Sequence, residues 1–166
     1  MPKPSDRSTT PHAEPSPGAL PGSHEVAQGA RHAAAVAFAT DIARLCHDLH
    51  CTDVLVLDVR GLSQVTDFLV VASGTSDRQM HSVLDHSLET GEQSGFAAIR
   101  TNIDSRSVWL VADFVDVVLH LFEPQTRAYY DLEMLWGDAP RVEWERPRER
   151  SRNLAGLSPD DVLPGD

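Results

Sequence analysis

The sequence has almost none of the residues that build disulfide frameworks or membrane spans. Cys46 and Cys51 are the only cysteines in 166 residues, too few for a set of disulfides or for a structural zinc site. We predict that both are reduced and buried. No apolar run is long enough to cross a bilayer, and residues 1–23 contain no hydrophobic segment of the signal-peptide type. The sequence therefore predicts a cytoplasmic location.

Lysine is also nearly absent. Lys3 is the only lysine, and residues 41–138 contain 16 Asp and Glu against 6 Arg. Such an acidic surface repels the phosphate backbone of nucleic acids unless a basic patch overcomes the field, and this range contains no such patch. We therefore expect a basic protein as the partner and no primary contact with nucleic acid.

Composition divides the chain into three parts. Residues 1–28 are dense in Pro, Ser, Gly and His and lack apolar periodicity, which predicts a disordered extension. Residues 145–166 combine an Arg-rich run with an end rich in Pro, Gly and Asp, and we predict disorder there too. Residues 29–144 remain as one domain with a single core.

Apolar periodicity in the first half of this domain predicts a helix, two strands and a second helix. The stripe of the first helix consists of Ala35, Phe38, Ile42, Leu45 and Leu49. Two runs rich in β-branched residues, 53–62 and 67–73, predict strands joined by a turn at Arg60 and Gly61. The second helix is expected to end at Gly95.

The second half of the domain is richer in strands. A short strand is expected near residues 97–100, and residues 107–122 are long and β-branched enough for a hairpin that reverses at 113–116. One short helix within 129–140 should end at Gly137 and Pro140. The predicted fold is a single α/β domain with a mixed five-stranded sheet flanked by helices.

The segment Gly74-Thr75-Ser76 joins a predicted strand to a predicted helix, as many phosphate-binding loops do. A Walker loop requires a lysine, which this domain lacks. Ser76 and Gln79 instead have the spacing of a capping box. We therefore predict that Gly74, Thr75, Ser76 and Arg78 form a helix-capping loop, with nucleotide binding as the alternative.

No set of catalytic or metal-binding residues is visible in the sequence. His81 and His86 are five residues apart, so they do not share a helix face, and no Glu completes a metalloprotease signature. Asp113 and Asp116 would hold magnesium in a degenerate nucleotidyltransferase, which is the alternative hypothesis, but acidic residues are common at such turns. We predict a protein that is not an enzyme and has no cofactor or metal.

Aromatic residues are concentrated late in the chain. Tyr and Trp are favoured as interface anchors because they combine a large apolar area with a polar group. Several of these rings exceed what one small core accommodates, which indicates a docking surface for a basic protein. The residues are Trp109, Phe114, Phe122, Tyr129, Tyr130, Trp136 and Trp144.

Three segments together resemble the signature blocks of the ribosomal silencing factor family, also called Iojap-like: VTDFLVVASGTSDRQMHSVLDH, VWLVADFVDVVLHLF and RAYYDLEMLWGDA. The resemblance spans residues 35–139. It implies a fold like that of nucleotidyltransferases without the catalytic carboxylates, and a homodimer in solution. It also implies binding to large-subunit protein fourteen on the intersubunit face of the large ribosomal subunit. The bound factor would block joining of the small subunit and damp translation under nutrient limitation.

The resemblance and the aromatic content together assign partner binding to Trp109, Asp113, Phe114, Asp116, Arg127, Tyr130 and Glu133. Aromatic side chains would supply affinity and carboxylates charge complementarity, and Arg127 is expected to order this face by pairing with a nearby acid. The chain departs from the family at Val115, where glycine is common and a β-branched residue resists positive φ. An adaptor role in ribosome assembly through the same surface is a further alternative.

Overall fold

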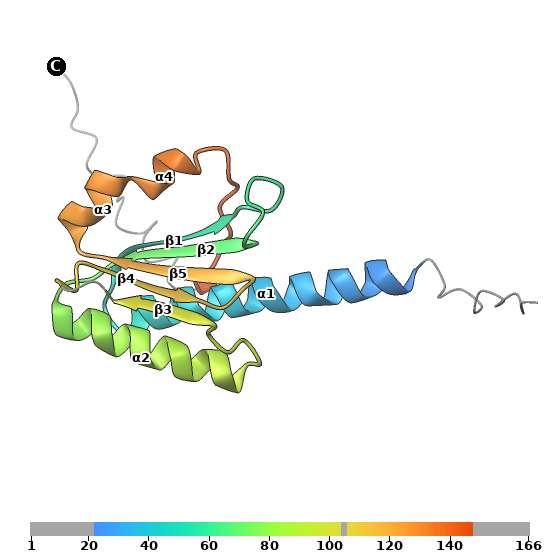
Figure 1. The fold of residues 1–166 in the computed structure, drawn as a ribbon, viewed down its shortest axis with the longest axis horizontal. Coiled ribbons are helices and arrows are strands. Elements are labelled where there is room, and N and C mark those ends of the chain that lie inside the picture. The colour runs from blue at the N-terminus through green and yellow to red at the C-terminus, as the bar shows by residue number, and fades with distance from the viewer. Residues whose placement is uncertain (1–21, 104–105, 148–166) are drawn as a thin grey trace, which may run out of the picture.

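The computed structural model describes residues 22–103 and 106–147, which form a mixed sheet with helices on both faces (Figure 1). The elements follow the order α1 (Ser23–Asp48), β1 (Thr52–Asp58), β2 (Phe68–Ser73), α2 (Asp77–Gln93), β3 (Arg100–Ile103), β4 (Trp109–Asp113), β5 (Val117–Phe122), α3 (Pro124–Tyr130) and α4 (Leu132–Leu135). The strands form one five-stranded sheet in the order β1-β2-β5-β4-β3. The predicted fold class is confirmed.

The limits predicted for the domain need a correction at each end. Helix α1 begins at Ser23, so residues 23–28 are helical rather than disordered. These residues are exposed, and the first turns of α1 extend beyond the sheet, which is why they show no apolar stripe (Figure 1). At the other end, Arg146 lies in the segment predicted to be disordered from 145, yet it binds the Asp48 carboxylate through hydrogen bonds of 2.8 and 2.9 Å. Residues 1–21 and 148–166 of the two predicted segments lie outside the described residues.

The sheet combines one parallel strand pair with three antiparallel pairs. β2 and β5 are parallel neighbours at the centre, paired from Phe68 with Val117 to Ser73 with Phe122. The other three pairings, β1 with β2, β4 with β5 and β3 with β4, are antiparallel. β3 begins at Arg100, where the strand predicted for 97–100 was expected to end.

The two long helices cover one face of the sheet. Phe38 and Ile42 of α1 and Val83 and Leu84 of α2 lie in one buried cluster with the inward residues of every strand except β3. A smaller cluster on the opposite face holds Leu57, Leu69 and Val71 against Leu132 and Trp136 at the C-terminal end of the chain. Helices α3 and α4 therefore cover mainly the β1 and β2 side of this second face (Figure 1).

The single short helix predicted for 129–140 is in fact part of two. Pro124 at the first position and Glu123 as the cap start α3, upstream of the predicted limit. Asp131 then adopts a left-handed conformation with φ 44°, ends α3 and caps α4 through its carboxylate. Left-handed Asp is tolerated because its short polar side chain bonds locally, so one residue serves as a cap in both directions.

The segment after α4 protects the exposed edge of β1. The N–H of Asp58 donates to the carbonyl of Pro140 at 2.8 Å, and the N–H of Val142 donates to that of Val56 at 2.8 Å. The indole N–H of Trp144 donates to the carbonyl of Val54 at 3.2 Å. These bonds occupy polar groups that would otherwise be available to another strand.

The hairpin between β4 and β5 reverses at a strained residue. Val115 has φ 75°, and the N–H of Asp116 donates to the carbonyl of Phe114 at 3.0 Å, which is the rarer hand of the γ-turn. The N–H of Val115 donates to Oδ1 of Asp113 at 2.9 Å. The predicted resistance of Val115 to positive φ is thus overcome by the hairpin, at a cost of about 1 to 2 kcal/mol.

Replacing Val115 by glycine should stabilise the protein. Glycine adopts φ 75° without the steric cost, and its greater freedom in the unfolded chain offsets only part of the gain, so we expect the free energy of unfolding to rise by about 1 kcal/mol. Urea denaturation measures the change. Val65→Gly is the control, because Val65 is exposed and does not have positive φ. Equal losses of stability in both variants would contradict the prediction.

Candidate partner-binding surface

The face of the sheet opposite α1 and α2 is only partly covered at β4 and β5. Burial alternates along β4, where Leu110 and Ala112 are buried while Trp109, Val111 and Asp113 are half-buried. On β5, Val118 and His120 alternate in the same way. The open sheet face is defined here as these half-buried residues: Trp109, Val111, Asp113, Val118 and His120.

An aromatic cluster occupies one end of the open sheet face. The Trp109 ring lies 4.7 Å from that of Tyr130 and 4.9 Å from that of Phe122, centroid to centroid. Tyr129 packs edge-on against Tyr130 at 5.1 Å and is 82% exposed. Trp109, Tyr129 and Tyr130 also line a groove of about 500 Å³. Their position between core and solvent suits interface anchors.

Trp109 is oriented by a histidine. Its indole N–H donates to Nδ1 of His120 at 3.2 Å. An indole nitrogen only donates, so Nδ1 must be unprotonated and the proton of a neutral ring lies on Nε2. Burial lowers the pKa of His120 to about 4, which keeps the ring neutral and this acceptor available at neutral pH.

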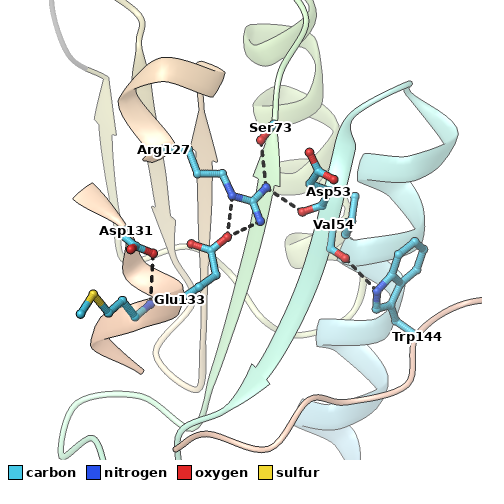
Figure 2. A network of polar contacts seen from close by, with 8 residues as sticks. Asp53, Val54, Ser73, Arg127, Asp131, Glu133 and Trp144 are labelled. Carbon is cyan, nitrogen blue, oxygen red and sulfur yellow. Dashed lines mark hydrogen bonds and ion pairs between the residues drawn. The ribbon is translucent and has the colours of Figure 1, made fainter. Parts of the chain in front are cut away.

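The Arg127 guanidinium connects α3 with β1, β2 and α4 (Figure 2). Its Nη1 donates to the carbonyl of Asp53 at 2.6 Å and to Oγ of Ser73 at 2.9 Å. Its Nε and Nη2 approach Oε1 of Glu133 at 2.8 and 2.6 Å. The expected pairing of Arg127 with a nearby acid is confirmed. Arg127 is 8% exposed, so it is a buried structural group and not a contact residue on the surface.

Two of the predicted contact residues, Phe114 and Asp116, do not lie on the open sheet face. Phe114 is 2% exposed and packs edge-on against Phe38 at 5.0 Å, so the prediction that it contacts a partner is wrong. Phe114 follows Leu110 and Ala112 at two-residue steps, so its side chain points to the same buried face of the sheet. Asp116 is bound by Arg31 of α1 through two hydrogen bonds of 3.0 Å.

Asp113 does share the open sheet face with Trp109. The two residues occupy opposite ends of β4, about 13 Å apart at the usual rise per residue. That distance lies well within one ordinary protein interface. Trp109, Tyr130 and Asp113 are therefore brought to one surface, while Asp116 and Phe114 are not.

The loop before α2 is a helix cap. The N–H of Gln79 donates to Oγ of Ser76 at 3.2 Å, which confirms the capping serine. The Gln79 side chain accepts from the N–H of Thr75, one residue earlier than a capping box requires, and donates to the carbonyl of Leu49 at 2.8 Å. Gly74 is needed for space, because a Cβ there would lie 2.1 Å from Cγ of Met80. Arg78 is exposed.

Two contributors to the surface were missed from the sequence. Tyr129 is among the late aromatic residues but outside the predicted site, and His120 is a polar residue within an apolar strand run that is also outside the predicted site. The alternation of burial on β5 would have placed His120 on the face of Trp109. Within residues 22–103 and 106–147, no three His, Cys, Asp or Glu side chains gather as metal ligands would.

Comparison with known proteins gives concordant matches. A family model described as "Ribosomal silencing factor during starvation" matches residues 32–161. Ribosomal silencing factor RsfS of Bacillus subtilis is 35% identical over 98 residues, which cover 59% of this chain and 83% of that protein. Chloroplastic protein Iojap of Zea mays is 32% identical over 108 residues, or 65% of this chain and 47% of that protein. A crystal structure of a Chromobacterium violaceum protein has a TM-score of 0.56 at 28% identity, covering 60% of this chain and 83% of that one.

Arg127→Met should destabilise the protein strongly, because the carbonyl of Asp53 and the hydroxyl of Ser73 would lose their buried donor. We expect a loss of about 2 to 4 kcal/mol in the free energy of unfolding. Arg31→Met is the matched control, since its pair with Asp116 is exposed on the arginine side and contributes little. The measurement is urea denaturation, and similar effects of both substitutions would refute the assignment.

His120 should remain a neutral Nε2–H tautomer well below pH 6.5. Its folded-state pKa of about 4 lies below the ordinary value, so the unfolded chain takes up a proton that the folded ring refuses. This contribution to stability is complete above pH 6.5 and is lost as the pH falls toward 4. Long-range proton–nitrogen NMR reports the tautomer and pKa. In Trp109→Phe the tautomer preference should weaken; ring protonation near pH 6.5 in the parent protein would contradict the prediction.

Proposed function

Because this chain belongs to the ribosomal silencing factor family, we propose that it represses translation by binding the large ribosomal subunit. The open sheet face docks on a basic protein of the intersubunit face, large-subunit protein fourteen, and the bound factor blocks joining of the small subunit. Repression operates in the cytoplasm under nutrient limitation. The free protein is a homodimer.

The open sheet face and its aromatic cluster are the observation that carries this proposal. Apolar and aromatic groups at Trp109 and Tyr130 are held in place but remain accessible, as anchor residues of interfaces are. Covering an exposed apolar patch removes it from water and is favourable, so such patches commonly mark binding sites for another protein.

Charge supports a basic partner. The full chain carries a formal net charge of −11, and Asp113 lies on the open sheet face itself. Opposite charge on the partner accelerates encounter and selects orientation, while the buried aromatic area supplies most of the affinity. Nucleic acid is disfavoured by the same field.

The arrangement of the two hairpin carboxylates favours a binding protein over a nucleotidyltransferase. Asp113 accepts from the N–H of Val115 and Asp116 forms a two-point pair with Arg31, so both already have partners within the chain. Magnesium would have to displace Arg31 to reach Asp116. The capping bonds of Ser76 likewise account for the loop that resembles a phosphate site.

Simultaneous substitution of Trp109 and Tyr130 by alanine should abolish co-sedimentation with isolated large subunits. The two rings pack together at 4.7 Å, and their loss removes the anchors while leaving the Arg127 contacts in place. We expect the parent protein to travel with large subunits, but not with small subunits or joined ribosomes. It should also suppress subunit joining in light scattering, and the double variant should not.

Val65→Ala is the control for this experiment. Val65 is 84% exposed in the loop between β1 and β2, at the end of the sheet opposite to Trp109. Circular dichroism must show that each variant is folded. Unchanged large-subunit binding by the folded double variant would overturn the proposed surface. Binding to immature precursors alone would support the assembly adaptor instead, and magnesium-dependent nucleotide binding in calorimetry would support the enzyme.

A further inference from the structure

The end of helix α1 brings the two cysteines of the chain together. The N–H of Cys51 donates to the carbonyl of Cys46 at 2.9 Å, and the N–H of His50 donates to that of His47 at 2.9 Å. His50 is left-handed, with φ 69°. These two bonds and the left-handed residue define a Schellman cap, in which the side chains at the positions of Cys46 and Cys51 characteristically touch.

The two thiols of this cap lie in one buried cluster and are chemically unequal. Both thiols are free, buried and part of the main core cluster. Cys46 donates its S–H toward the sulfur of Cys51, which lowers the pKa of Cys51, although burial opposes this effect. The same hydrogen bond, together with burial, raises the pKa of Cys46. Cys51 is therefore the better nucleophile of the pair.

Cys51 is also more accessible to solvent than Cys46. Cys51 is 5% exposed and lines an open groove of about 870 Å³, together with His47, Trp144 and Arg127. Cys46 is 0% exposed and lies beneath it. A small oxidant entering the groove meets Cys51 before Cys46.

We propose that Cys46 and Cys51 form a redox-active dithiol site, which hydrogen peroxide converts to an intramolecular disulfide. The Cys51 thiolate attacks one peroxide oxygen, the O–O bond breaks, and the departing hydroxide takes a proton to become water. Cys46 then attacks the sulfenic sulfur of Cys51, the S–O bond breaks, and the second hydroxide leaves as water with the proton of Cys46. The two thiols lose two electrons, and the peroxide gains them.

The cap makes this reaction local. Both cysteines lie at one helix end and are already joined by a backbone hydrogen bond, so closure requires no movement of distant segments. A disulfide across the cap replaces a thiol contact inside the core and leaves the surface of the protein unchanged. Oxidised protein should therefore remain folded, with the same oligomeric state as the reduced protein.

Mass spectrometry of the intact native chain tests the proposal. Purified reduced protein is treated with a small excess of hydrogen peroxide, unfolded, and alkylated with N-ethylmaleimide. We expect a species lighter by about 2 Da that takes up no maleimide and regains both thiols after dithiothreitol. Peptide mapping should place the bond between residues 46 and 51.

Two single variants test the order of the steps. In Cys46→Ala, Cys51 should accumulate as a sulfenic acid that dimedone traps; in Cys51→Ala, the fully buried Cys46 should stay unmodified. Circular dichroism checks that both variants are folded. The proposal is overturned if the native parent chain keeps both thiols while the urea-unfolded chain oxidises. Bonds between chains, or trapping at Cys46 instead of Cys51, would overturn it equally.

Discussion

The guanidinium of Arg127 fixes the relation between the strand ends and the C-terminal helices. It reaches the start of β1 through the carbonyl of Asp53, the end of β2 through Ser73 and the start of α4 through Glu133. β1 is irregular at this point, since its register with β2 shifts between Thr52 and Leu55. A buried guanidinium loses free energy if any of these acceptors moves away, so the irregular strand and α3 are held together. The helix held in this way, α3, also carries Tyr130, whose ring lies 4.7 Å from that of Trp109.

The uneven covering of the sheet connects this scaffold with recognition. Two long helices bury one face of every strand except β3, whereas α3 and α4 are short and lie mainly on the β1 and β2 side of the other face. Trp109 is thus packed from within by Phe122 and held by His120, yet remains half-buried. Rings fixed in this way lose little conformational entropy when a partner covers them, which is the advantage of a prepared surface over a flexible one. Asp113 adds charge at the far end of the same strand.

Much of this architecture could be predicted because the local signals are strong. The two β-branched runs predict β1 at the edge of the sheet and β2 beside it, and Ser76 with Gln79 predicts the cap of α2. Phe114 was misassigned because its neighbours resemble a surface turn, although strand parity places it with Leu110 and Ala112 inside. The first turn and a half of α1 was missed for the opposite reason: these residues are helical without burying a face, and periodicity detects only helices that do.

What the sequence conceals most is where non-glycine residues take left-handed conformations. Glycine is the strongest signal for such a conformation, whereas His50, Asp53 and Asp131 are of types that are enriched there but do not mark the position by themselves. A hydrogen bond offsets the conformational cost at each residue. The N–H of Cys51 donates to the carbonyl of Cys46 around His50, and Arg127 donates to the carbonyl of Asp53. The carboxylate of Asp131 itself accepts from the N–H of Met134 at the start of α4. The pairing of Cys46 with Cys51 at the end of α1 is hidden in the same way, because the backbone bond between them depends on the left-handed conformation of His50. The left-handed conformation at each of these residues therefore depends on contacts in the folded protein. Those conformations also bring together groups, such as Cys46 and Cys51, whose pairing the sequence pattern does not predict.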